Sequence, residues 1–162
     1  MAADWQLDTA SIDDIPALLR LWREVPGIGL GRGDDPPSLQ RFLERNAATC
    51  LVVRSGSAVR AGVLGGFDGR RGFIYHLAVH PDWQGRGLGR ALVEEVTARL
   101  WRLGAQKVHL FVYPDNLAAR RFYRRLGWVE RGDIVVVSWD GRNAGSDGGP
   151  GRTAGPAEGQ NR

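Results

Sequence analysis

The chain has 162 residues, of which 43% are hydrophobic and 25% charged, with a formal net charge of +4. This length is typical of one domain with a single core. No apolar run approaches the roughly 18–20 residues of a membrane span, and the N-terminus lacks the pattern of a secretory signal. The lone Cys50 excludes an intrachain disulfide framework. We therefore expect a soluble cytoplasmic protein that makes no membrane contact.

The basic side chains are 21 arginines and one lysine, Lys107. A high isoelectric point can indicate nucleic-acid binding. Here the charges do not form runs, and a coding bias towards arginine explains them more simply. We expect no nucleic-acid partner.

The composition changes near the C-terminus. Residues 140–162 contain seven of the 23 glycines and no aromatic or large aliphatic side chain. Such a segment cannot bury enough apolar surface to offset the entropy lost on ordering. We predict a folded domain over residues 1–139 and a disordered tail over residues 140–162.

The first half of the domain combines two helices with three strands. Asp13 or Asp14 can cap a helix with apolar residues at helical spacing, and a second short helix is predicted over residues 38–46. A loop rich in glycine and proline, residues 26–37, separates them. The strands are predicted over residues 49–53, 58–67 and 72–79, with a hairpin turn at Asp68-Gly69.

The second half begins with a glycine-rich turn and a long helix that ends at Gly104. The elements predicted after it are a strand over 107–113, a helix from Asp115 or Asn116 to Gly127, and strands over 128–129 and 134–139. The order predicts an α/β fold with a central mixed β-sheet of six to seven strands, flanked by about four helices.

The glycine-rich turn, Gln84 to Arg90, is the clearest chemical signal in the chain. It follows a strand and opens a helix, so unpaired backbone N–H groups and the helix dipole favour a phosphate ligand. Arg86 and Arg90 add positive charge. A Walker A loop is excluded because no Gly-Lys-Ser/Thr follows, and the dinucleotide fingerprint fails because its sixth position is Arg90.

The turn, read as Gln84-x-x-Gly87-x-Gly89, resembles the acetyl-CoA pyrophosphate loop of the GNAT superfamily of N-acetyltransferases. Residues 77–83 are similar to the end of that family's fourth strand, and residues 112–116 and 118–128 to its fifth strand and the helix after it. The chain looks like a small single-domain bacterial member. The resemblance implies a sheet that splays between the fourth and fifth strands, with acetyl-CoA as co-substrate in the opening.

The resemblance also implies roles for individual residues. Asn116 would contact acetyl-CoA by its side chain, although a plain helix cap is the alternative. Tyr123 would be the catalytic acid that protonates the departing thiolate, or else an aromatic residue of the core. The remaining implied cofactor-binding residues come from the fourth strand and the turn: Leu77, Ala78, Val79, Gly85, Arg86, Gly87, Leu88, Gly89 and Arg90.

The resemblance implies direct attack of an amine on the thioester, which requires that the amine lose a proton. Members that modify proteins carry a glutamate on the fourth or fifth strand, where this chain has Phe73 and Phe111. Tyr75, His109 or a water relay remain as bases. Strict alternation places Tyr75 on the face of Phe73, and His76 on the opposite face as a structural residue.

The acceptor is expected to be a small-molecule, amino-acid or peptide amine. Asp34 and Asp35 either attract a cationic amine or are solvated loop carboxylates. We expect no bound metal, because the histidines have no cluster of ligands at suitable spacing. The alternative function is a catalytically silent module that binds acetyl-CoA as a sensor or regulator. The oligomeric state is expected to be a monomer or homodimer.

Overall fold

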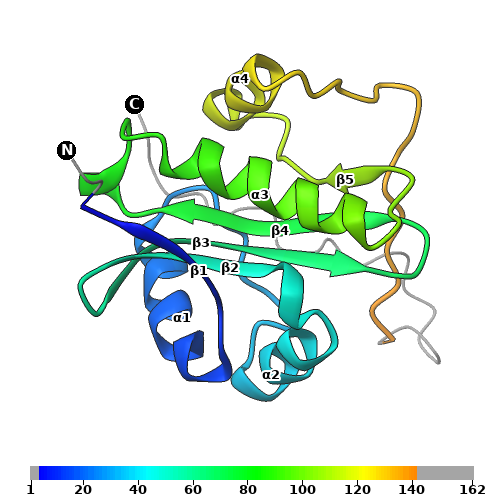
Figure 1. The fold of residues 1–162 in the computed structure, drawn as a ribbon. Coiled ribbons are helices and arrows are strands. Elements are labelled where there is room, and N and C mark those ends of the chain that lie inside the picture. Colours follow the sequence, from blue (N-terminus) through cyan, green and yellow to red (C-terminus); the bar gives the residue numbers. More distant parts are fainter. Residues whose placement is uncertain (1–3, 142–162) are drawn as a thin grey trace. The chain divides into compact units, whose positions relative to one another are not determined.

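The computed structural model describes residues 4–141 (Figure 1). The chain divides into two compact units, Met1–Arg121 and Phe122–Arg162. Apart from its first two residues, the tail predicted over 140–162 lies outside the described residues. No helix in the described part is long and apolar enough to cross a membrane.

The N-terminal unit contains a five-stranded sheet in the order β1-β2-β3-β4-β5. The first four strands pair antiparallel, and β5 runs parallel to β4. The strands are β1 (Gln6–Thr9), β2 (Cys50–Ser55), β3 (Ala58–Phe67), β4 (Gly72–Val79) and β5 (Val108–Leu110). The predicted mixed sheet is confirmed, but the count of six to seven strands was too high for the part of the chain described.

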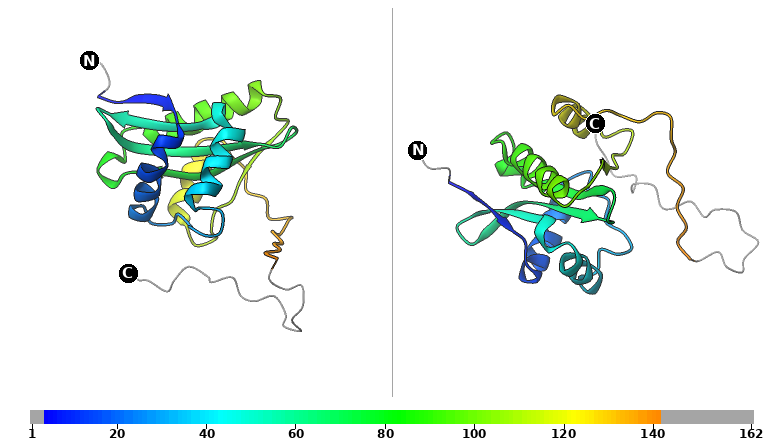
Figure 2. Two further views of the ribbon diagram at one scale, coloured as in Figure 1. Left: turned by 90° about the horizontal axis from the view of Figure 1, so that it is seen from below. Right: turned by 45° about the vertical axis from the view of Figure 1, so that its right-hand side comes forward.

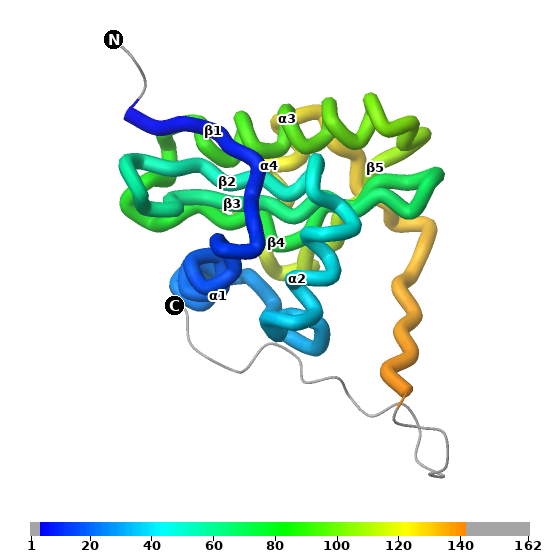
Figure 3. The backbone as a smooth tube through the Cα atoms, turned by 60° about the horizontal axis from the view of Figure 1, so that its bottom comes forward, coloured from blue at the N-terminus to red at the C-terminus, as the bar shows by residue number. Residues whose placement is uncertain are grey.

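The α-helices over residues 4–141 are α1 (Ile15–Glu24), α2 (Pro36–Arg45), α3 (Leu88–Arg102) and α4 (Leu117–Arg125). Helices α1 and α2 lie together on one face of the sheet, and α3 covers the other (Figures 1 and 3). The second view in Figure 2 shows the same two layers. About four helices were predicted, and this arrangement confirms the α/β class.

Two amphipathic patterns explain these layers. The apolar stripe of α1 is buried against the sheet, and Trp22 at its end is only 1% exposed. The stripe of α3 is buried on the opposite face. Its members are Leu88, Leu92, Val96 and Leu100. Each side of the sheet therefore has its own apolar core, as helical periodicity predicts.

The strands predicted over residues 128–129 and 134–139 are absent: residues 128–141 contain no strand. Val135 and Val137 are 85% and 88% exposed. Alternating β-branched residues favour extended backbone, but a strand also needs a hydrogen-bonded neighbour. The prediction was wrong because local propensity carries no information about such a neighbour.

The protein's single thiol, Cys50, lies on β2 in the core next to α1 and is completely buried. Burial raises the pKa of this thiol to about 12. Cys50 is therefore protonated at neutral pH and packs as a small apolar side chain.

A nearly buried carboxylate joins the start of α1 to the sheet. Asp14 is 6% exposed and accepts hydrogen bonds from the backbone N–H of Ser11 and from Arg54 Nη2, each at 2.8 Å. Burial by itself raises the pKa of Asp14. The hydrogen bonds from Arg54 and Ser11 and the charge of Arg54 outweigh burial, so the pKa lies below its usual range.

A carboxylate with a lowered pKa stabilises the fold above its unfolded pKa, and this stability is lost as pH falls through the folded pKa. Asp14→Asn is expected to lower the unfolding free energy at pH 7 by about 1–3 kcal/mol. The loss should shrink as the pH falls below about 4, the unfolded pKa of an aspartate, and through the lower pKa of folded Asp14. Urea unfolding at pH 7 and pH 3 measures both effects.

The matched control is Asp13→Asn, which removes the same charge from an exposed neighbour. It is expected to change the unfolding free energy by less than about 0.5 kcal/mol. Equal losses for the two variants at pH 7 would contradict the role given to the Asp14–Arg54 pair.

Candidate active site

The turn between β4 and α3 contains two glycines in the left-handed region, Gly85 with φ 74° and Gly87 with φ 84°. A Cβ at either position would meet nothing within 4 Å, so backbone conformation and not space requires glycine. Gly87 is the N-cap of α3, and the first helical bond runs from Ala91 N–H to its carbonyl. The N–H groups of residues 88–90 therefore have no acceptor within the helix.

The polar side chains of the turn fix its geometry and charge. Gln84 Nε2 donates to the Val79 carbonyl at 3.1 Å, tying the turn back to the end of β4. The guanidinium of Arg86 lies 4.5 Å from the centre of the Trp83 ring. Arg90 pairs with Glu94 at 2.7 Å. Arg86 and Arg90 thus lie at the surface of the turn, and Glu94 offsets part of the charge that the sequence indicated.

Strands β4 and β5 pair over only three residues each, ending at Ile74 and Leu110. Beyond that point β4 continues to Val79 with no β5 residue as its partner. The predicted divergence of the fourth and fifth strands is therefore present, and β5 is shorter than the predicted 107–113. The proposed cofactor residues of β4, Leu77 to Val79, all lie in the part of the strand that has no β5 partner.

A β-bulge lies in β4 at the start of the opening. Gly62 and Leu64 of β3 pair with Ala78 and Tyr75, so three steps along β4 match two along β3. Within the bulge, His76 has φ 50°, a left-handed conformation that is uncommon for a residue with a side chain. The extra residue breaks the strict alternation assumed from the sequence.

As a result, His76 lies on the same face as α1. Its ring centre is 4.7 Å from that of Trp22, and its Nε2 lies 2.7 Å from Asp34 Oδ1 in the loop between α1 and α2. The expectation that His76 faces away from Tyr75 was wrong, because Tyr75 also packs against the core beside α1. Sequence periodicity held no signal for this bulge.

Aromatic rings line the same face from α2 to β5. The Tyr75 ring meets the Phe42 ring edge-on, with 5.9 Å between the ring centres. It stacks with the Phe73 ring, with 6.2 Å between the centres. Phe73 in turn lies 5.8 Å from the His109 ring and 6.5 Å from Phe111. Burial raises the pKa of Tyr75, with a smaller effect from Asp68. Phe73 and Phe111 stand at the two positions where a glutamate was expected in acetyltransferases that modify proteins. This face is therefore apolar at both positions.

The loop between α1 and α2 crosses to the chain after β5. Cβ atoms built at Gly27 and Gly29 would collide with the side chains of Asn116 and Tyr113, so the loop passes closely over both. Asp35 caps α2 by accepting from Ser38 N at 3.0 Å, which lowers the pKa of Asp35. Asp34 and Asp35 are both occupied by hydrogen bonds and are not simply solvated carboxylates.

Asn116 is a helix cap in the structure. Its Oδ1 accepts from the Ala119 N–H at 3.1 Å, while its Nδ2 is the atom that approaches Gly27. Its implied contact with acetyl-CoA stays a prediction.

Tyr123 belongs to the C-terminal unit. Its ring makes edge-on contacts with Phe122 and Trp128, at 5.0 and 5.7 Å between centres. Burial raises the pKa of the Tyr123 phenol well above its usual range. The phenol is therefore a proton donor at neutral pH and a weaker acid than free tyrosine.

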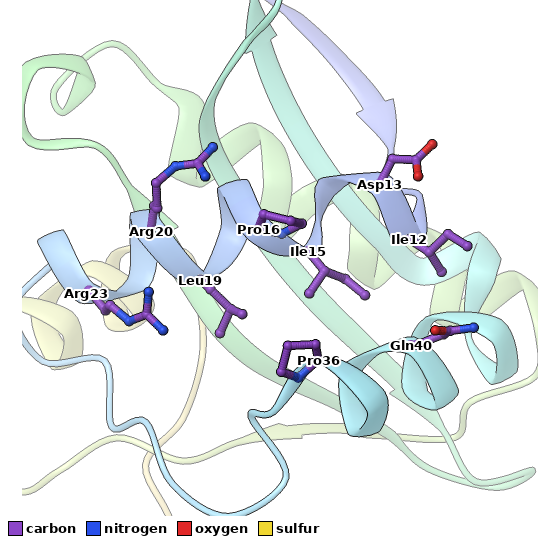
Figure 4. A pocket seen from close by; sticks show the side chains of 9 residues that line it. All are labelled: Ile12, Asp13, Ile15, Pro16, Leu19, Arg20, Arg23, Pro36 and Gln40. Carbon is purple, nitrogen blue, oxygen red and sulfur yellow. The ribbon is translucent and has the colours of Figure 1, made fainter.

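A separate groove of about 440 Å³ lies between α1 and α2 (Figure 4). It contains no residue of the turn, of β4 or of the chain after β5, so it is distinct from the opening beside the turn. It is lined by Ile12, Asp13, Ile15, Pro16, Leu19, Arg20, Arg23, Pro36 and Gln40. Over residues 4–141, no group of three or more acidic, histidine or cysteine side chains is arranged to hold a metal ion.

A mixed sheet that opens between two parallel strands, beside a glycine-rich turn at a helix N-terminus, defines the fold shared by N-acetyltransferases of the GNAT type. A family model described as the acetyltransferase (GNAT) family matches residues 15–128. The chain belongs to this family. The prediction of an N-acetyltransferase from the glycine-rich turn and the segments around it is thereby confirmed.

Individual acetyltransferases are also similar to this chain. An acetyltransferase of Pectobacterium atrosepticum is 36% identical over 126 residues, which are 77% of this chain and 87% of that protein. Ard1 of Thermoplasma volcanium superposes with a TM-score of 0.69 at 20% identity, over 78% of this chain and 84% of the other. The PaiA N-acetyltransferase of Thermoplasma acidophilum, solved in complex with coenzyme A, has a TM-score of 0.68 at 17% identity, over 78% and 89%. These superpositions show a shared fold.

The loop between α1 and α2 offers a direct test of its contact with Asn116. Gly27→Ala adds a Cβ 2.6 Å from Asn116 Nδ2 at a residue with φ 85°. We expect Asn116 to be displaced and its bond to Ala119 weakened, so that the Ala119 amide exchanges faster by hydrogen-exchange NMR.

The control is Gly33→Ala in the same loop, where φ is 90° but a Cβ meets nothing within 4 Å. It introduces the same backbone strain without the contact, so exchange at Ala119 should stay as in the wild type. The same acceleration in both variants would show that strain alone is responsible.

Proposed function

We propose that the protein transfers the acetyl group of acetyl-CoA to an amine of a small molecule, amino acid or peptide. The observation that carries the proposal is the turn with Gly85 and Gly87 beside the end of β4 that has no β5 partner. Amides at a helix N-terminus suit a pyrophosphate, and an exposed strand edge suits an extended amide-containing chain. Coenzyme A contains both groups in one molecule.

The residues of the turn fit this co-substrate chemically. The space around Gly85 and Gly87 is open, so an anionic group can approach the backbone N–H groups of residues 88–90. Arg86 and Arg90 supply cationic side chains at the same turn. On β4, backbone groups of Leu77 and Val79 would bind the pantetheine arm, while Ala78 pairs with Gly62 of β3. The Val79 carbonyl is already used by Gln84, so Val79 would contribute its N–H.

The chain's residues have three tasks in the transfer. Backbone N–H groups of β4 would polarise the thioester carbonyl, since fixed donors stabilise the charge that develops on oxygen. A base must take the proton that the amine loses on forming the amide. Tyr123 would return a proton to the departing sulfur. A phenol is protonated at neutral pH and can donate to a developing thiolate.

The decisive experiment measures thiol release from acetyl-CoA in the presence of spermidine, lysine, glucosamine, phenylethylamine or an alanyl peptide. We expect at least one amine to accelerate release, with the acetylated amine detected by mass spectrometry. Tyr123→Phe should lower kcat for that amine by about 10²-fold. Binding of acetyl-CoA without amine-dependent release would favour the catalytically silent sensor.

Binding of the co-substrate is tested separately at the turn. Gly87→Ala places a side chain in the left-handed region, at a cost of about 1–2 kcal/mol. The turn is expected to relax away from its present conformation, and the Kd for coenzyme A to rise about tenfold. Isothermal titration calorimetry measures this change.

The matched control is Gly69→Ala in the hairpin between β3 and β4. Gly69 has φ 98°, and a Cβ there also meets nothing within 4 Å. This variant carries similar strain far along the chain from the turn, so its Kd for coenzyme A should match that of the wild type. A wild-type Kd for Gly87→Ala would contradict the assignment of the turn.

A further inference from the structure

We infer that His76 is the base that accepts the proton of the acceptor amine and that Asp34 is the residue that positions it. The inference rests on the acetyl transfer proposed above and assigns the proton acceptor for that reaction. It replaces the set of open alternatives with a specific pair of residues, 42 positions apart in the chain.

His76 lies in β4 close to the point where the pairing with β5 stops. Pairing between β4 and β5 ends at Ile74, and His76 lies two residues further along β4, within the bulge. Leu77, the first proposed contact of the pantetheine arm, follows it directly. His76 therefore lies in the strand at the point where the opening begins, next in the chain to the proposed pantetheine contact, and its ring lies against Trp22 of α1.

The hydrogen bond to Asp34 fixes which nitrogen of His76 carries a proton. A carboxylate only accepts hydrogen bonds, so Nε2, at 2.7 Å from Asp34 Oδ1, must be the protonated nitrogen. In the neutral ring Nδ1 then presents its lone pair. Asp34 is itself held, because its Oδ2 accepts from the Gly31 N–H at 2.7 Å. This is the arrangement of a base with an orienting carboxylate.

The residues around His76 hold its imidazole ring in place but leave it accessible to solvent. Trp22, which is 1% exposed, contacts one side of the imidazole. The side chains of His76 and Asp34 remain 18% and 16% exposed. A small amine can reach such a ring, and a proton can leave it for solvent after the reaction.

The other candidates are less suitable. Tyr75 would have to lose its proton first, and burial raises the pKa of this phenol. His109 lies opposite Phe73, in the part where β4 and β5 are still paired, and its ring is near that of Phe73. Phe73 and Phe111 have no proton-accepting group.

The proposed step is balanced in atoms and charge. The neutral amine nitrogen forms a bond to the acetyl carbon, the C–S bond breaks, and the electron pair stays on sulfur. Nδ1 of His76 takes one N–H proton as the amide forms, giving an imidazolium that Asp34 stabilises. The thiolate gains a proton from Tyr123, the imidazolium releases its proton to solvent, and the Tyr123 phenolate takes up one proton from solvent, which restores both residues.

The groups facing His76 are few. Asp34 is the charged one, in the loop after α1; Trp22 of α1 is uncharged, and β3 contributes Gly62 and Leu64 around the bulge. Glu24, at the end of α1, pairs instead with His80 at 3.4 Å.

The test compares His76→Gln, Asp34→Asn and Asp35→Asn, with the panel amine that gives the fastest thiol release. His76→Gln should lower kcat by about 10²-fold or more and leave the KM for acetyl-CoA unchanged. Asp34→Asn should cause a smaller fall. Asp35→Asn is the matched control, because asparagine also caps helices, and it should retain wild-type kcat.

Two further measurements distinguish catalysis from structure. Added imidazole should restore part of the activity of His76→Gly, which a merely structural histidine would not allow. Nitrogen-15 NMR of the His76 ring should show the Nε2–H tautomer in the wild type and a mixture in Asp34→Asn, without any turnover. Circular dichroism and thermal unfolding verify that each variant folds.

The outcomes separate this inference from the proposed function. Wild-type turnover with an unchanged kcat in His76→Gln would overturn the role of His76 alone. An equal fall in Asp34→Asn and Asp35→Asn would overturn the positioning role of Asp34. Failure of every amine in the panel with the wild type would overturn both proposals.

Discussion

One extra residue in β4 determines where His76 lies in the candidate site. The bulge at His76 shifts the pairing with β3, so that Ala78 and not Leu77 lies opposite Gly62. It occurs just beyond the last pair between β4 and β5. Within the bulge, the imidazole of His76 lies against Trp22 of α1. A regular strand would place His76 on the opposite face from Tyr75.

The two sides of the opening are built from different parts of the chain. The side proposed for acetyl-CoA consists of backbone from β4 and the turn before α3, so its chemistry depends on conformation more than on side-chain type. The opposite side consists of side chains on α1, on α2 and in the loop between them. The two proposed substrates are therefore assigned to different parts of the chain.

The parts predicted correctly from the sequence were encoded locally. The strands before the turn, the helix after it and the left-handed glycines all follow from periodicity and residue type over a few positions. The pair formed by His76 and Asp34 joins residues 42 positions apart through a bulge that alternation cannot reveal. The prediction of the final strands failed for a related reason. Val135 and its neighbours have β propensity but no partner strand within the described residues. Asn116 illustrates an intermediate case, in which the alternative of a helix cap was foreseen and the structure shows the cap.

The burial of Cys50 has a practical consequence for enzymology. Thiol reagents react with the thiolate, and this side chain is both fully buried and protonated at neutral pH, with a pKa of about 12. It is also the protein's single cysteine. Any colour that such a reagent develops with the folded protein therefore counts coenzyme A molecules alone. Single-turnover measurements at high protein concentration become feasible without a correction for protein thiols.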